Sequence, residues 1–168
     1  MKPYILTLVW LMVGISIFSW MYIQYVYPLD IAAGYLSRAQ SAGYAEDVAR
    51  YVRLALPHIP RGGNPVWMFP TSRTDFTLMN GDLNAILDRL SIAAGLPRDT
   101  SAYSQALNDI RGRLGIIINN IGEAMPYIML SPTNTAILVL WMLSLPIIHR
   151  LSRRLIRRES QPVGQERH

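Results

Sequence analysis

The sequence has no cysteine and only one lysine, Lys2, among its 168 residues. Without cysteine the chain can form no disulfide framework, thiolate zinc site, iron–sulfur cluster or cysteine nucleophile. Charged residues make up only 16% of the chain, against about 25% in a typical soluble domain, while hydrophobic residues make up 51%. This composition excludes a disordered chain, and the length excludes a transporter with many spans.

The first apolar run predicts a transmembrane helix over residues 1–28. No residue between Lys2 and Asp30 is charged. The 24 residues between Pro3 and Pro28 would form a helix about 36 Å long, which crosses a bilayer with some tilt. A cleaved signal peptide is the alternative, but its apolar core is typically only about 7–15 residues long. We therefore expect an uncleaved anchor. Aromatic residues cluster near its second end, as at a membrane interface: Trp20, Tyr22, Tyr25 and Tyr27.

A second apolar run predicts a transmembrane helix over residues 127–149. It carries no charge between Glu123 and Arg150, and Pro132 is suited to the first turn of its helix. A buried core helix of a soluble protein is the alternative, because apolar length alone does not distinguish the two. The basic segment over residues 150–168 favours the membrane, because arginines concentrate on the cytoplasmic side of a span.

The distribution of charge predicts the orientation of the two spans. The whole net charge of +5 lies at the ends of the chain, where Lys2 supplies one charge and residues 150–168 supply four. The 98 residues between the spans, 29–126, hold nine arginines and nine acidic residues. By the positive-inside rule both termini lie in the cytoplasm, and residues 29–126 lie outside the cell membrane.

Residues 29–126 predict an extracytoplasmic domain of about three helices and no strand, so the fold class is an all-α membrane protein. The first helix, over 44–55, repeats apolar residues at helical spacing and ends before Pro57. The second carries an apolar face over 83–90, with Gly95 as its candidate C-cap.

The third helix carries a regular apolar stripe. Thr100 or Ser101 is suited to its N-cap, and Pro126 is expected to end it. Along it, apolar residues alternate steps of four and three, as in a coiled coil: Tyr103, Leu107, Ile110, Leu114, Ile117 and Ile121. The first four of these residues are candidate contacts with a partner.

The segment over residues 57–75 predicts an irregular loop, because it holds four prolines and the Gly62–Gly63 pair. Trp67, Met68 and Phe69 form an apolar knot within it. Such a loop either packs back over the core of its domain or contacts a partner. An exposed Trp-Met-Phe patch would mark an interaction site, so these three residues are also candidate partner contacts.

We find no nucleotide-binding loop, glycine fingerprint, nucleophile elbow or pair of histidines at helical spacing, and so expect neither enzymatic activity nor a cofactor. His58, Met68 and Met79 could in principle meet as soft ligands of copper, but methionines more often fill a core. Asp75 and Asp82 lie where helix caps are expected. Within the spans no ionisable residue marks an ion path.

Small and large side chains occur together in the spans, and they either pack against neighbouring helices or face lipid. The small ones in the first span are Gly14, Ser16 and Ser19, and the large ones in both spans are Trp10, Trp20 and Trp141.

The basic tail predicts contact with anionic lipid headgroups. Each arginine near such a surface contributes about 1 kcal/mol. Nucleic-acid binding is the weaker interpretation, because the membrane orientation already accounts for these arginines. The candidate headgroup contacts are Arg150, Arg153, Arg154, Arg157 and Arg158.

Two functions fit this layout. In the first, the chain is a non-catalytic accessory subunit of a larger integral-membrane complex, and its outer domain caps or docks on partner subunits. In the second, it is a two-span sensor whose outer domain dimerises through the Tyr103–Ile121 stripe and signals through a partner. Its outline resembles the input half of bacterial chemoreceptors and sensor kinases, in architecture alone. Residues 150–168 are too few for a signalling domain, which favours the accessory subunit.

Overall fold

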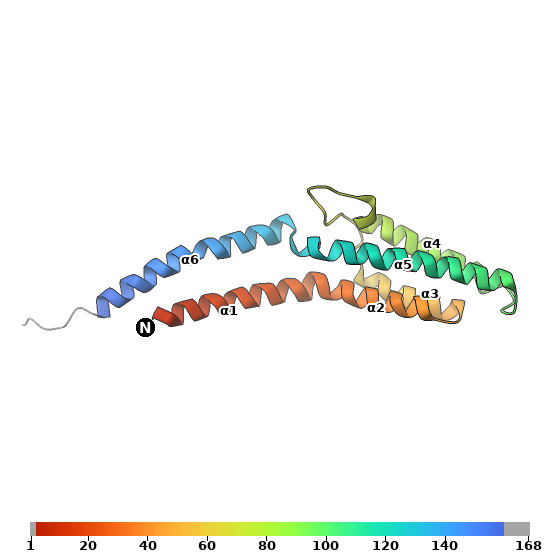
Figure 1. Cartoon of the computed structure of the whole chain (residues 1–168), viewed down its shortest axis with the longest axis horizontal. Coiled ribbons are helices and arrows are strands. Elements are labelled where there is room, and N and C mark those ends of the chain that lie inside the picture. The colour runs from red at the N-terminus through yellow and green to blue at the C-terminus, as the bar shows by residue number, and fades with distance from the viewer. Residues whose placement is uncertain (1–2, 160–168) are drawn as a thin grey trace, which may run out of the picture. The chain divides into compact units, whose positions relative to one another are not determined.

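The computed structural model describes residues 3–159, and every regular element in that range is a helix (Figure 1). The all-α class predicted from the sequence is therefore confirmed. The chain forms two compact units. One pairs helix α1 (Pro3–Met21) with helix α6 (Pro132–Glu159). The other, Tyr22–Ser131, holds the remaining helices and is called the bundle below.

Two helical stretches are long and apolar enough to cross a membrane, Ile5–Ser41 and Pro132–Arg154. The first passes from α1 through the π-helical turn η1 (Tyr22–Val26) into α2 (Tyr27–Ser41). The helix therefore continues past Pro28, beyond the predicted segment 1–28. Proline removes one backbone hydrogen bond and crowds the preceding turn. The wider π turn directly before Pro28 accommodates that irregularity, so the helix continues.

The bundle consists of α2, α3 (Ala45–Ala55), α4 (Phe76–Ala93) and α5 (Ser101–Met129). Each helix contacts the next along the chain, and α5 also contacts α2, which closes the ring around one core. The chain reverses direction between successive helices (Figure 1). Four helices replace the three predicted, because the sequence analysis placed no helix between residue 29 and the predicted helix over 44–55, where most of α2 lies. Half of its buried residues are alanines: the four are Leu29, Ala32, Leu36 and Ala39.

The up-and-down path places both attachments of α1 and α6 at one end of the bundle, as expected for an even number of antiparallel helices. We call it the junction end; it carries Tyr22, Ser131 and the long α3–α4 connection around the 3-10 turns η2 (Leu56–His58) and η3 (Ser72–Thr74). The opposite end, called the distal end, carries the α2–α3 and α4–α5 turns. The α3–α4 loop therefore lies at the same end of the bundle as its first and last residues, Tyr22 and Ser131.

Two of the predicted caps are confirmed and two are wrong. A carboxylate oxygen of Asp75 accepts the Thr77 N–H at 2.8 Å and caps α4. The Thr100 hydroxyl accepts the Tyr103 N–H at 3.3 Å and caps α5. Asp82 lies inside α4, and the C-cap of that helix is Ala94 rather than Gly95.

The predicted boundaries of the second span also change. Helix α5 continues through Pro126 to Met129, so residues 127–129 belong to the bundle. Helix α6 begins at Pro132, as the sequence predicted, and runs past residue 149 to Glu159.

Candidate interaction surfaces

The apolar stripe of α5 forms the centre of the bundle core. Tyr103, Leu107, Ile110 and Leu114 are 5%, 3%, 2% and 0% exposed, and Ile117 and Ile121 are buried with them. The interpretation of the first four as partner contacts is therefore corrected. The helix α5 packs against α2 and α4 of the same chain. The prediction failed because one apolar helical seam is suited equally to a dimer and to a bundle.

The hydroxyl of Tyr103 has a further role inside the core. It accepts the backbone N–H of Ala45 at 2.9 Å, where both groups are buried. Ala45 is the first residue of α3, so this N–H has no partner within its own helix. Tyr103 thereby joins α5 to the start of α3 through a side chain that is otherwise apolar.

We expect Tyr103→Phe to lower the free energy of unfolding by about 1–3 kcal/mol, because it leaves a buried N–H without an acceptor. Tyr44→Phe is the matched control, since Tyr44 precedes the same helix but is exposed. Its effect should stay within about 0.5 kcal/mol. Thermal unfolding of the full chain in detergent measures both variants, and equal effects would contradict the role given to the Tyr103 hydroxyl.

The loop between α3 and α4 is anchored in the core by the buried Ile59, and its remaining part is held by hydrogen bonds. The Asn64 side chain spans it: its amide donates to the Thr71 carbonyl at 2.7 Å, and its oxygen accepts the Val66 N–H at 3.0 Å and the Thr74 hydroxyl at 2.8 Å. Gly63 adopts a φ of 93°, a left-handed conformation that favours glycine. The loop therefore has a defined shape.

The tip of this loop exposes three consecutive large apolar side chains. Trp67, Met68 and Phe69 are 50%, 64% and 77% exposed, so the knot does not pack back over the core. The Trp67 indole N–H donates to the carbonyl of Leu130 at 2.9 Å. This bond fixes the tip against the end of α5, two residues before α6 begins. The sequence identified the knot but not this anchoring bond, which joins residues 63 positions apart.

Helices α1 and α6 are joined by a pair of tryptophans. The rings of Trp10 and Trp141 stack with centroids 4.2 Å apart and planes within 9°. The Trp10 N–H donates to the Ser144 hydroxyl at 2.9 Å and the Trp141 N–H donates to the Trp10 carbonyl at 3.3 Å. Gly14 makes room for the Trp141 ring, because a Cβ there would overlap it, and Phe18 meets that ring edge-on at 6.3 Å.

A second face of α1 is an open apolar groove. Its lining residues repeat at helical spacing, and they differ from those that meet α6. The Ser16 hydroxyl donates to the Met12 carbonyl of the same helix at 2.9 Å, so its polar group is satisfied without a partner helix. The groove is lined by Val9, Met12, Val13, Ser16, Ile17 and Trp20.

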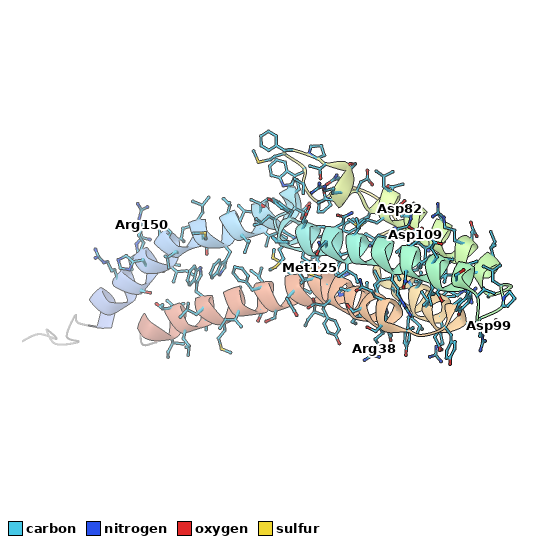
Figure 2. All side chains as sticks on the ribbon, turned by 45° about the vertical axis from the view of Figure 1, so that its right-hand side comes forward. Arg38, Asp82, Asp99, Asp109, Met125 and Arg150 are labelled. Atoms are coloured by element: carbon cyan, nitrogen blue, oxygen red, sulfur yellow. The ribbon has the colours of Figure 1, made fainter. Side chains whose placement is uncertain are left out.

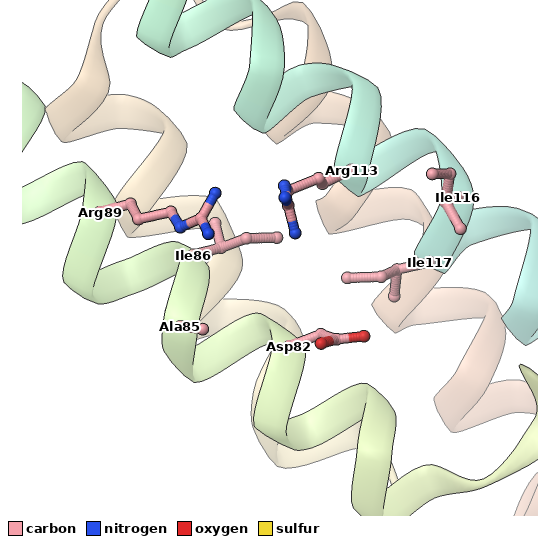
Figure 3. A pocket seen from close by; sticks show the side chains of 7 residues that line it. All are labelled: Asp82, Ala85, Ile86, Arg89, Arg113, Ile116 and Ile117. Carbon is pink, nitrogen blue, oxygen red and sulfur yellow. The ribbon is translucent and has the colours of Figure 1, made fainter. Parts of the chain in front are cut away.

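A small pocket lies between α4 and α5. Arg89 and Arg113 point toward one another across it, with Asp82 on the α4 side (Figure 3). Both guanidinium groups pair with the one carboxylate of Asp109, each at 3.4 Å, which offsets part of their positive charge. The volume is about 100 Å³, below the roughly 300–1,000 Å³ of small-molecule sites. We assign no ligand to it.

The distal end carries an exposed cluster around Arg98. Its guanidinium donates to Glu46 at 2.9 Å and lies 4.9 Å from the centre of the Tyr44 ring. A backbone N–H at the start of α3 and the Arg98 bond hold the pKa of Glu46 below its ordinary value, and Glu46 in turn raises the pKa of Arg98. Exposed ion pairs of this kind contribute little to stability.

The three candidate copper ligands have different environments. Met79 is buried in the bundle core, Met68 is exposed at the loop tip, and the His58 ring stacks on Tyr35 with centroids 6.1 Å apart. The copper interpretation is therefore not supported. In the described part of the chain no group of three or more His, Cys, Asp or Glu side chains could hold a metal ion.

Charged side chains lie on the outside of both units, as labelled for Arg38, Asp99, Asp109 and Arg150 (Figure 2). Of the basic tail, Arg150, Arg153 and Arg154 are exposed on α6. Residues 157 and 158 belong to α6, but the side chains of Arg157 and Arg158 lie outside the described residues, as do residues 160–168.

Comparison of this chain with protein-family models, with curated proteins and with solved structures finds no match.

Proposed function

We propose that this chain is a two-span integral-membrane protein that acts as a non-catalytic accessory subunit of a larger membrane complex. Its bundle lies outside the cytoplasm and both termini lie inside. The two long apolar helices and the concentration of net charge at the chain ends support this placement. The role is structural: the chain packs beside partner subunits within the bilayer, and its bundle caps or docks on them outside.

The observation that carries this proposal is the second face of α1. One face of this helix is occupied by the tryptophan pair with α6, while the groove around Met12, Ser16 and Ile17 stays open. Transmembrane helices associate where a small residue lets a neighbour approach closely, and Ser16 supplies that residue. A helix of a partner subunit fits such a groove.

The two-span sensor is the second candidate, but it loses the dimer contact from which its signalling was inferred. Its dimer was to form through the Tyr103–Ile121 stripe, and the bundle buries that stripe within one chain.

Purification of the full chain in mild detergent, with mass analysis of the proteins that accompany it, tests the proposal. We expect larger membrane proteins in fixed stoichiometry. Ser16→Leu should reduce their recovery, because it fills the groove, whereas Ser19→Leu should not, since Ser19 is exposed on α1 but does not line the groove. A clean monomer or homodimer, or equal recovery with both variants, would contradict an accessory role through this face.

A further inference from the structure

The exposed loop tip lies at the junction end of the bundle. Trp67 donates its N–H to Leu130, and Leu130 precedes Pro132, the first residue of α6, by two positions. Two residues span at most about 7 Å, so the Trp67 indole lies within a short distance of the point where α6 begins. The start of the bundle at Tyr22 lies at the same end, because the four helices alternate in direction.

The composition of the loop is typical of a segment at a lipid surface. Its tip combines two aromatic rings with a flexible methionine, and tryptophan favours the interface because its ring is apolar and its N–H is polar. Arg61 and Arg73 flank the tip, and no acidic residue occurs between positions 58 and 74. The Arg73 guanidinium lies 3.9 Å from Glu123, both on exposed side chains, which is a weak pair.

Further exposed apolar residues lie at the junction end. They come from the first and the last residues of the bundle. They are Tyr22, Ile23, Tyr27, Tyr127 and Leu130.

We propose that Trp67, Met68 and Phe69 insert into the interfacial layer of the membrane that α1 and α6 cross, as a third membrane contact of the chain. The inference rests on the proposed two-span topology and goes beyond it. Hydrogen bonds through Asn64 and Leu130 hold the tip in shape, so little conformational freedom is lost on insertion. The contact fixes the bundle against the bilayer surface.

The absence of native cysteine allows a direct test in the full chain. An environment-sensitive fluorophore is attached to the cysteine of the Met68→Cys variant. The labelled protein is then reconstituted alone into vesicles of phosphatidylcholine and phosphatidylglycerol. Brominated lipids and aqueous iodide then act as the two quenchers. Ile92→Cys, exposed near the distal end of α4, is the water-facing control. Leu140→Cys, exposed on α6, is the lipid-facing control.

We expect the label at position 68 to be quenched by brominated lipid and protected from iodide, and the label at position 92 to behave in the opposite way. Phe69→Asp in the Met68→Cys background should move the label toward water and weaken lipid quenching. Full iodide access at position 68, with lipid quenching retained at position 140, would overturn the inference while leaving the spans intact. Protection at position 68 only in native membranes that hold partner proteins would also overturn it, in favour of a protein contact.

Loss of lipid quenching at position 140 would overturn the two-span topology and the inference together. The accessory role is tested separately, because these vesicles contain no partner subunit. A failure to find partner proteins therefore does not change the result expected at position 68.

Discussion

Gly14→Ala should disrupt the packing of α1 against α6, whereas Gly34→Ala should leave the protein unchanged or slightly more stable. A Cβ at position 14 would overlap the Trp141 ring, which is held by stacking on Trp10 and by hydrogen bonds. Overpacking of this kind costs about 1–3 kcal/mol. At Gly34, inside α2, no atom lies within 4 Å of the added Cβ, and alanine favours a helix by up to about 1 kcal/mol.

Two measurements on the full chain in detergent check this prediction. Thermal unfolding reports the opposite signs of the two substitutions. Circular dichroism reports the stacked indoles, which couple excitonically, so Gly14→Ala and Trp10→Phe should both weaken that signal. An undiminished signal in Gly14→Ala, with the same unfolding temperature as Gly34→Ala, would show that the tryptophan pair does not join these helices.

Ile117→Ala should destabilise the bundle by about 2–5 kcal/mol, because it removes buried methyl groups and leaves a cavity. Ile117 is 3% exposed among the core residues of α5. Its neighbour Ile116 is 62% exposed, and the same substitution there should change stability by only about 0.5 kcal/mol. Chemical denaturation of the two variants in detergent measures the difference.

This pair of adjacent isoleucines also tests the correction made to the α5 stripe. If the stripe mediated a dimer rather than the core of one chain, the effect of Ile117→Ala would depend on protein concentration. We expect no such dependence. Equal destabilisation at positions 116 and 117 would contradict the described orientation of α5.

Periodicity predicted α3, α4 and α5 because their apolar residues repeat at helical spacing between clear end signals. The caps at Asp75 and Thr100 were predictable for a similar reason, since a short polar side chain directly precedes an apolar run. In contrast, α2 was missed because two signals mislead: Pro28 suggests an end, and the buried face is built partly from Ala32 and Ala39, which give a weak apolar pattern.

The candidate surfaces were predictable only in part. The tip residues Trp67, Met68 and Phe69 stand out in the sequence, but no local pattern indicates the hydrogen bond that anchors Trp67 to Leu130. The stacking of Trp10 on Trp141 is likewise a contact between distant positions. The α5 stripe was assigned to a partner because its spacing does not say whether the facing helix belongs to the same chain.

The central claim is that the chain crosses a membrane twice and presents its bundle outside the cytoplasm. Single cysteines at Ile92 and Arg150, in a chain that has none of its own, test it with a membrane-impermeant maleimide. In intact spheroplasts that express the protein, we predict labelling of Ile92→Cys and no labelling of Arg150→Cys until the membrane is permeabilised. Labelling of Arg150→Cys with protection of Ile92→Cys would contradict the account.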